Sequence, residues 1–166
     1  MIRLTTKLTP EMASETVAQA SVVLPLDLRI KTRQRVTLES GEDAGIFLEK
    51  GAILRGGEKL QSEDGLVVEI IAANENVSSV YVDDALALAK AAYHLGNRHI
   101  PLQIDTGVLR YQHDHVLDEM VKGFGLTVTV EQAPFEPEGG AYKSGSHAHG
   151  SHSHGAHSHG DGEHSH

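Results

Sequence analysis

The chain contains no cysteine among its 166 residues. This absence excludes disulfide bonds, thiolate zinc sites, iron–sulfur clusters and cysteine nucleophiles together, and it permits a reducing compartment. Basic residues are also scarce, because 14 lysines and arginines stand against 23 acidic residues and give a formal net charge of -9. Nucleic-acid binding needs clustered cations that outnumber nearby carboxylates, so the charge balance argues against a nucleic-acid partner.

Long apolar runs are absent as well. Residues 1–8 lack the basic start and the apolar stretch of a signal peptide, and no segment approaches the ~20 apolar residues of a membrane span. We therefore expect a cytoplasmic protein that does not associate with a membrane. The length suits one ordinary domain or two small ones.

Short apolar runs separated by turn residues fill the chain from Met1 to about Asn74. Four runs have the length and composition of strands, and they are 21–24, 35–38, 44–48 and 66–71. The segments between them carry glycine or aspartate, which tolerate positive φ and close hairpins, and they are 39–43, 55–58 and 62–65. Residues 1–74 are therefore predicted to form a small all-β domain.

The second half alternates strands with helices. Residues 77–82 are typical of a strand, and residues 85–95 consist almost wholly of strong helix formers. Asp83 or Asp84 can cap the start of this helix, and Gly96 can cap its end.

Four further elements follow and complete the order β-α-β-β-α-β. They are a hairpin of 100–104 and 108–111, a helix at about 114–122 and a strand at 126–130. This order over residues 75–143 predicts a ferredoxin-like domain, so the whole chain is expected to belong to the α+β class.

The last 23 residues, 144–166, contain eight of the twelve histidines. They include no aromatic or branched aliphatic residue, so burial cannot offset an ordering cost of ~1–2 kcal/mol per residue, and we predict a disordered tail without metal. Serine, alanine and glycine separate repeated His-x-His pairs, which favours a native metal-binding segment over a purification tag. The candidate ligands are His147, His149, His152, His154, His157, His159, His164 and His166. Imidazole binds Ni2+, Cu2+ and Zn2+ alike, so this chemistry leaves the metal open.

Two other histidines flank the end of the first predicted helix. His94 lies in its last turn, where the helix dipole stabilises an imidazolium, and this favours a structural role over a ligand role. His99 lies in the following loop, where its ring can project outward. A lone exposed histidine is one interpretation, and one half of a site shared across a two-fold axis is the other.

His113 and His115 flank Asp114 at the start of the second predicted helix. If the backbone is extended at His113, the two rings can share a face and chelate one ion. Asp114 can cap the helix, orient an imidazole or bind the metal, and capping is the favoured role.

Four cations alternate along the first half, at Arg29, Lys31, Arg33 and Arg35. On an extended strand they would lie on one face. Such a face is either an ordinary solvated surface or a docking edge for an acidic partner protein. The sequence has no Ser-His-Asp arrangement, Walker loop or Gly-x-Gly-x-x-Gly motif, so we expect that the protein is not an enzyme.

Several longer blocks are more specific than the tail. The longest is Tyr93-His-Leu-Gly-Asn-Arg-His-Ile-Pro-Leu-Gln-Ile104. The others are 24–33, 54–57, 111–117, 124–128, 134–137 and 140–142. Together they closely resemble the UreE family of urease accessory proteins, the nickel metallochaperones, over essentially the whole chain.

The resemblance implies how the chain is divided. It implies an N-terminal β domain, 1–74, that binds a peptide or partner protein, and a ferredoxin-like metal domain, 75–143. The remaining segment, 144–166, matches the His-rich extension that some members carry. The family further implies a homodimer with a shared nickel site.

By position, the resemblance makes His99 the interfacial ligand, one from each subunit, and His113 and His115 peripheral ligands. The implied partners are the urease accessory GTPase and the apo-urease complex. We therefore expect a nickel-binding metallochaperone that captures Ni(II) and delivers it for assembly of the dinuclear nickel site of urease. Storage or buffering of nickel or zinc without delivery is the alternative.

Overall fold

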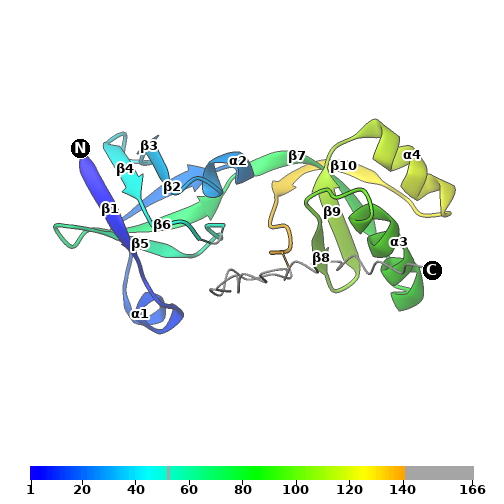
Figure 1. Cartoon of the computed structure of the whole chain (residues 1–166), viewed down its shortest axis with the longest axis horizontal. Helices are drawn as coiled ribbons and strands as arrows, with labels where there is room; N and C mark the ends of the chain where they lie inside the picture. Colours follow the sequence, from blue (N-terminus) through cyan, green and yellow to red (C-terminus); the bar gives the residue numbers. More distant parts are fainter. Residues whose placement is uncertain (52, 141–166) are drawn as a thin grey trace, which may run out of the picture.

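The computed structural model of the chain describes residues 1–51 and 53–140. These residues form two β-sheets and four helices, so the architecture is mixed α/β. Figure 1 shows the two sheets next to each other along the longest axis, with the N-terminus at one end. Within this part of the chain, no helix is both long and apolar enough to cross a membrane. The expectations for the tail, 144–166, lie outside the described residues.

The first sheet has the strand order β2-β6-β5-β1-β4-β3. Its strands are β1 (Ile2–Lys7), β2 (Ala20–Leu24), β3 (Arg33–Thr37), β4 (Asp43–Phe47), β5 (Lys59–Ser62) and β6 (Val67–Ala72). β1 pairs in parallel with β4, and β2 pairs in parallel with β6, while the other pairs are antiparallel. Alternate side chains, including Leu4, Ile46 and Ile70, are fully buried in its core, since successive strand residues point to opposite faces.

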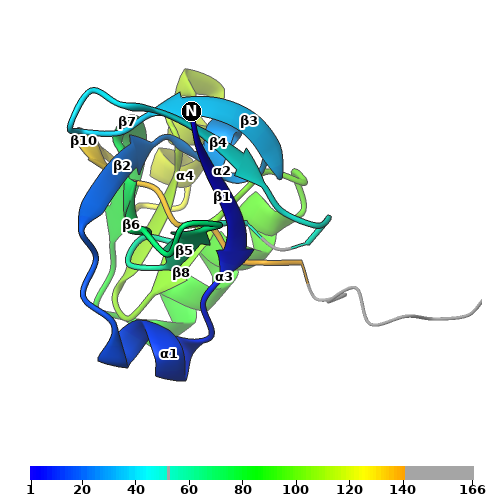
Figure 2. The same cartoon turned by 90° about the vertical axis from the view of Figure 1, so that its left-hand side faces the viewer.

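The prediction of strands alone for residues 1–74 is wrong, because two short helices interrupt them. α1 (Pro10–Glu15) begins where the Thr9 side chain accepts a hydrogen bond from the Met12 N–H, 3.3 Å away. α2 (Leu26–Arg29) follows directly after β2. Figure 2 shows α1 at the lower end of this half of the molecule. Helices of four to six residues are too short to show an apolar period in the sequence.

Strands β1 and β5 were not predicted. Each places isolated apolar residues, such as Leu4 and Leu60, between polar ones, so neither forms an apolar run. The turns at 39–43 and 62–65 close hairpins, as expected. The turn at 55–58 does not, because β4 pairs with β1 and β3 and not with β5.

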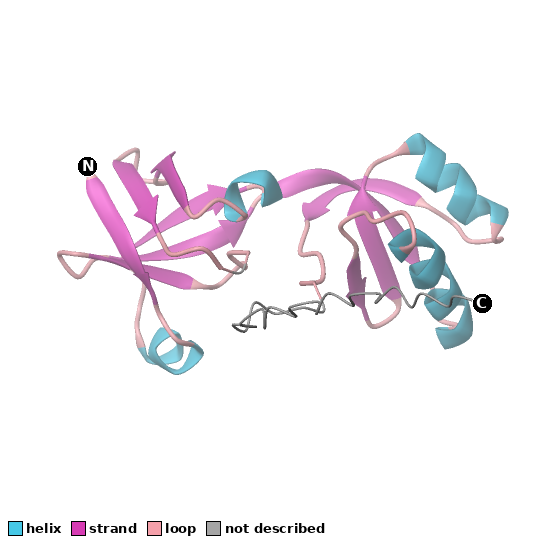
Figure 3. Cartoon of the chain, viewed as in Figure 1, coloured by secondary structure: helices cyan, strands magenta, loops and turns pink. Residues whose placement is uncertain are grey.

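The second sheet has the strand order β10-β7-β9-β8, and all neighbouring strands are antiparallel. The elements of this half are β7 (Asn74–Tyr81), α3 (Ala85–Gly96), β8 (Gln103–Asp105), β9 (Val108–Gln112), α4 (His115–Gly123) and β10 (Thr129–Pro134). Figure 3 shows α3 and α4 on the same side of the sheet. Val80 and Leu109 of the sheet belong to one apolar core with Leu95 of α3 and Val121 of α4.

Both helices of this half occupy their predicted positions. Asp84 caps α3, since its side chain accepts a hydrogen bond from the Ala87 N–H, 2.8 Å away. β8 is shorter than predicted and begins at Gln103. Pro101 has no N–H to contribute to a strand ladder, so the residues near it do not extend β8.

The last strand lies further along the chain than the predicted 126–130. Leu126 and Val128 pack against the core beneath the helices. The ladder with β7 runs from Thr129 to Pro134. A proline is tolerated there because β10 is an edge strand of the sheet.

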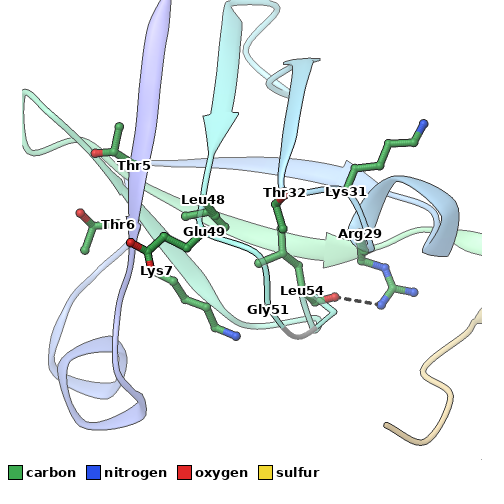
Figure 4. Close-up of a pocket in the computed structure, with 10 residues that line it drawn as sticks. All are labelled: Thr5, Thr6, Lys7, Arg29, Lys31, Thr32, Leu48, Glu49, Gly51 and Leu54. Carbon is green, nitrogen blue, oxygen red and sulfur yellow. Dashed lines mark hydrogen bonds between the residues drawn. The ribbon is translucent and has the colours of Figure 1, made fainter. Parts of the chain in front are cut away.

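The predicted row of cations on one strand face is also wrong. Arg29 ends α2 and is only 1% exposed, Lys31 lies in the following loop, and β3 begins at Arg33. Figure 4 shows the Arg29 and Lys31 side chains pointing in different directions, with Arg29 bonded to the Leu54 carbonyl. Only Arg33 and Arg35 share a strand.

The Arg29 guanidinium instead connects the first half of the chain to the segment after β10. Its Nε donates to the Leu24 carbonyl at 3.1 Å, and its Nη1 donates to the Leu54 carbonyl at 3.2 Å. The same group donates to the Glu136 carboxylate and to the Phe135 carbonyl. The buried apolar cluster that also joins the two halves consists of Leu26, Val77 and Phe135.

Candidate metal site

His99 lies in the turn that follows α3, and it is exposed. The N–H groups of Arg98 and His99 donate to the carbonyls of Leu95 and Gly96, each at 3.0 Å. His99 has a φ of 56°, in the left-handed region that residues other than glycine seldom occupy. The predicted stop, Gly96, still belongs to α3, so the left-handed residue of this turn is the histidine itself.

The segment that leads to the tail is held close to this turn. The Glu138 N–H donates to the Leu102 carbonyl at 2.8 Å, and the Glu136 N–H donates to the side-chain oxygen of Gln103 at 2.9 Å. Leu102 follows His99 by three residues in the sequence. Glu138 is therefore bonded to the segment that follows the His99 turn.

His113 lies between β9 and α4, with one ring nitrogen turned toward the protein. Its Nδ1 is 3.1 Å from the Ser78 Oγ and 3.2 Å from the Asp118 Oδ2. The side chain is 34% exposed. Because Nδ1 is engaged, Nε2 is the nitrogen available to a metal ion.

Asp118 and Tyr111 form the buried side of this arrangement. Asp118 is 5% exposed and Tyr111 is fully buried. The Tyr111 hydroxyl donates to the Asp118 Oδ1 at 2.8 Å. Burial raises the pKa of the Tyr111 phenol above its ordinary value, and the hydrogen bond to Asp118 raises it further. The phenol therefore stays protonated and remains a donor.

Asp114 caps α4, as the sequence predicted. Its Oδ1 accepts hydrogen bonds from the N–H groups of Val116 at 2.8 Å and Leu117 at 3.2 Å. These two bonds, with that from Leu117 the larger cause, lower the pKa of the Asp114 carboxyl. His115 is the first residue of the helix and is exposed, so it extends into solvent beside a carboxylate that is committed to the cap.

His94 packs against aromatic rings. Its ring centroid is 4.8 Å from that of Phe124 and 5.2 Å from that of Tyr93. It also borders a shallow pocket between α3 and the end of α4, together with Leu86 and Lys90. These contacts suit the structural role predicted for His94.

The candidate ligands of the second half do not form a three-residue metal site within residues 1–51 and 53–140. In that part of the chain, no group of three or more histidine, aspartate or glutamate side chains is arranged to hold a metal ion. The eight tail histidines proposed as ligands lie outside the described residues. In the structure, His99, His113 and His115 are exposed.

Sequence reasoning missed the side chains that orient His113. Asp118 lies on the face of α4 that also carries Leu117 and Val121, and a carboxylate on an otherwise apolar helix face is the signal that was available. Ser78 and Tyr111 could not be connected to it without the pairing of β7 with β9.

Two protein-family models match this chain. One, described as the N-terminal domain of the UreE urease accessory protein, matches residues 4–73. The other, described as the C-terminal domain of the same protein, matches residues 75–166. The chain belongs to the UreE family. The family predicted from the sequence blocks is thereby confirmed.

Members of the UreE family from several bacteria are similar over most of their length. A urease accessory protein UreE of Alcanivorax borkumensis is 56% identical over 153 residues, which cover 87% of each chain. That of Tolumonas auensis is 57% identical over 145 residues, covering 87% of this chain and 77% of the relative. That of Pseudomonas putida strain F1 is 58% identical over 129 residues, 77% of each chain. As a UreE family member, the protein is an accessory protein and not an enzyme.

Proposed function

We propose that the protein is a cytoplasmic nickel metallochaperone for urease maturation. Imidazoles of the tail capture Ni(II) and pass it to a site formed by His99 from two copies of the chain. The urease accessory GTPase then receives the ion for insertion into apo-urease. The observation that carries the proposal is an exposed His99 in a UreE family chain, three residues before Leu102, whose carbonyl accepts the Glu138 N–H.

The two halves have separate roles in this proposal. Residues 1–74 form a domain that binds a peptide or partner protein, and residues 75–143 form a ferredoxin-like metal domain. In chain order the second sheet reads 4-1-3-2, with a helix in each crossover, which supports the ferredoxin-like assignment. The N-terminal family model ends at residue 73 and the C-terminal model begins at residue 75, which supports a division into two domains at this point. The first domain also has an open groove of about 320 Å³, which is lined partly by Thr32 and Leu48 (Figure 4). We propose this groove as a place where a peptide could bind.

The His99 site suits a carrier because it holds few ligands. One exposed imidazole cannot retain an ion, but a homodimer brings a second from the same position. A pair of neutral nitrogens binds nickel through exchangeable ligands, so the ion can leave again. A random coil of 23 residues, the length of segment 144–166, spans roughly 25–30 Å, which supports transfer of the ion from the tail to His99.

Paired variants of the full chain test the two roles. Truncation after Lys143 is expected to lower the number of nickel ions bound and to leave urease activation largely intact. His99→Asn is expected to abolish activation. Asparagine is the matched replacement because it tolerates the left-handed backbone of His99 and lacks the imidazole, whereas alanine would add strain.

The control is His94→Asn, which removes an exposed imidazole five residues away and should leave activation unchanged. Urease activity in cells that carry the urease operon is the measurement. If truncation abolishes activation and His99→Asn does not, the roles are reversed. Storage or buffering without delivery predicts that no variant affects activation and that a pull-down finds no GTPase with or without nickel.

A further inference from the structure

We infer that the buried Asp118 is a positioning residue that holds the His113 ring with a proton on Nδ1 and presents the Nε2 lone pair to metal. The inference deepens the proposed function, since it concerns metal capture at His113. Its physical basis is the chain of contacts from Tyr111 through Asp118 to His113.

The geometry selects one tautomer of the ring. As a carboxylate, Asp118 has only hydrogen-bond acceptors, and its Oδ1 already receives the Tyr111 hydroxyl at 2.8 Å. Its Oδ2 lies 3.2 Å from the His113 Nδ1. An unprotonated Nδ1 would place its lone pair against an anionic oxygen, so Nδ1 must be the donor. Ser78 does not alter the choice, because a hydroxyl can donate or accept.

The arrangement also fixes the orientation of the ring. Ser78 belongs to β7, Tyr111 to β9 and Asp118 to α4, so three packed elements hold the groups around Nδ1. The N-cap at Asp114 fixes the start of that helix. Within residues 1–51 and 53–140, His113 is the histidine whose ring makes a hydrogen bond to a side chain, that of Ser78, and its Nδ1 also lies beside the Asp118 carboxylate, which distinguishes it from His115.

A carboxylate beside the nitrogen that does not bind the metal is common among metal-binding histidines. A carboxylate that accepts the N–H of the other nitrogen orients the ring and raises its basicity, and loss of that carboxylate weakens metal binding by about 10–100-fold. Asp118 is therefore assigned a role in metal affinity, and not only in the packing of α4.

Asp118→Asn is the decisive variant because it keeps the shape and places an N–H donor where a carboxylate oxygen lies 3.2 Å from the His113 Nδ1. The Tyr111 hydroxyl still donates to the side-chain oxygen, so the amide nitrogen faces Nδ1 and donates to it. The His113 proton then moves to Nε2, where it blocks the position that the metal needs. The matched control is Glu119→Gln, the same loss of charge one residue along, at a side chain that is 73% exposed and bonded to Lys122.

Two measurements on the metal-free and metal-loaded full chain test the inference. Long-range 1H–15N correlation spectra at about pH 8.5, where imidazole is neutral, report the tautomer of each ring. His113→Gln identifies its resonances. Zinc, held at fixed free concentrations by a metal buffer, then reports occupancy at His113 separately from the tail, because each ring has its own resonances.

We expect a proton on Nδ1 of His113 in the wild-type protein and in Glu119→Gln, and on Nε2 in Asp118→Asn. The affinity of His113 for zinc, obtained from its occupancy at several free zinc concentrations, should fall by about 10–100-fold in Asp118→Asn, with the tail histidines unchanged. Should Asp118→Asn fail to fold, Ser78→Ala serves instead, and it must keep the proton on Nδ1 because Asp118 remains.

The inference is overturned if wild-type His113 carries its proton on Nε2, if Ser78→Ala moves that proton, or if Asp118→Asn changes neither proton nor occupancy. It is also overturned if the tautomer reverses while zinc never binds wild-type His113. None of these results bears on the roles proposed for the tail and His99. Conversely, a His99→Asn chain that still activates urease would contradict the proposed transfer of nickel to His99 and would leave the inference about Asp118 unchanged.

Discussion

Replacing Arg29 with methionine removes the charged group that joins the two halves of the chain. Methionine fills the volume of the arginine stem, so the change tests the guanidinium itself. The Leu54 and Phe135 carbonyls lose their donor, the Leu24 carbonyl keeps only the Ala73 N–H, and the Glu136 carboxylate loses its cation. Figure 4 shows the bond to the Leu54 carbonyl. We expect a large loss of stability from a residue that the sequence presents as one of a row of surface cations.

The magnitude follows from burial. Removing one partner of a buried ion pair costs about 3–5 kcal/mol, and each buried carbonyl left without a donor costs about 1–3 kcal/mol. The Glu136 side chain is 29% exposed, so water solvates part of its charge and the separate costs do not add in full. A loss of about 3–5 kcal/mol is therefore expected, a substantial share of the ~5–15 kcal/mol that stabilises a typical domain.

Urea unfolding followed by far-ultraviolet circular dichroism measures this loss, and two variants calibrate it. Arg35→Met removes an exposed cation, 70% accessible and paired with Asp43, and should produce no measurable change. Arg29→Lys keeps the charge but supplies a point donor in place of the planar fork, so it should recover less than half of the loss. A loss below about 1 kcal/mol for Arg29→Met, or an equal loss for Arg35→Met, would refute the reasoning.

Two predictions concern pH. The fold lowers the pKa of the Asp114 carboxyl from its ordinary value of 3.8. The ionised carboxylate therefore stabilises the folded chain at any pH above the pKa of the unfolded state. This stabilisation is lost as the pH falls through the lower pKa of the folded state. Urea unfolding should therefore show that the wild type is more stable than Asp114→Ala at neutral pH and that the difference disappears in acid. A difference in stability that persists at about pH 2 would contradict the assignment. Nickel binding should fail as pH falls through ~6.5, the ordinary histidine value, because protonated imidazole cannot bind metal. Equilibrium dialysis measures it, and full retention of nickel at about pH 4.5 would exclude imidazole as the main ligand.

The regular elements with a strong pattern were predictable from the sequence, and the irregular ones were not. α3 is rich in helix formers and carries a capping aspartate, Asp84, so its start was correctly placed. β1 and β5 lack an apolar run, and β5 has only four residues, so local pattern could not identify them. The residue types of Leu126 and Val128 predict a strand, but both side chains pack against the core of the second half instead.

The candidate site divides in the same way. His99, His113 and His115 were identifiable as possible ligands because imidazole is a metal-binding group wherever it is exposed. The cap at Asp114 was predictable because it depends on residues two and three positions away. Asp118 was not, because its contact with Tyr111 and its approach to His113 depend on how α4 packs over the sheet.

The sequence by itself determined the family, the helices of the second half and the chemical identity of the candidate ligands, since these depend on residue type and on neighbours along the chain. Only the tertiary structure decided which charged groups are buried. Arg29 leaves the surface because the carbonyls of Leu24, Leu54 and Phe135 surround it. His113 acquires a defined ring orientation because β7 and α4 place Ser78 and Asp118 beside it. Contacts between residues far apart in the chain carry no local pattern, so packing alone reveals them.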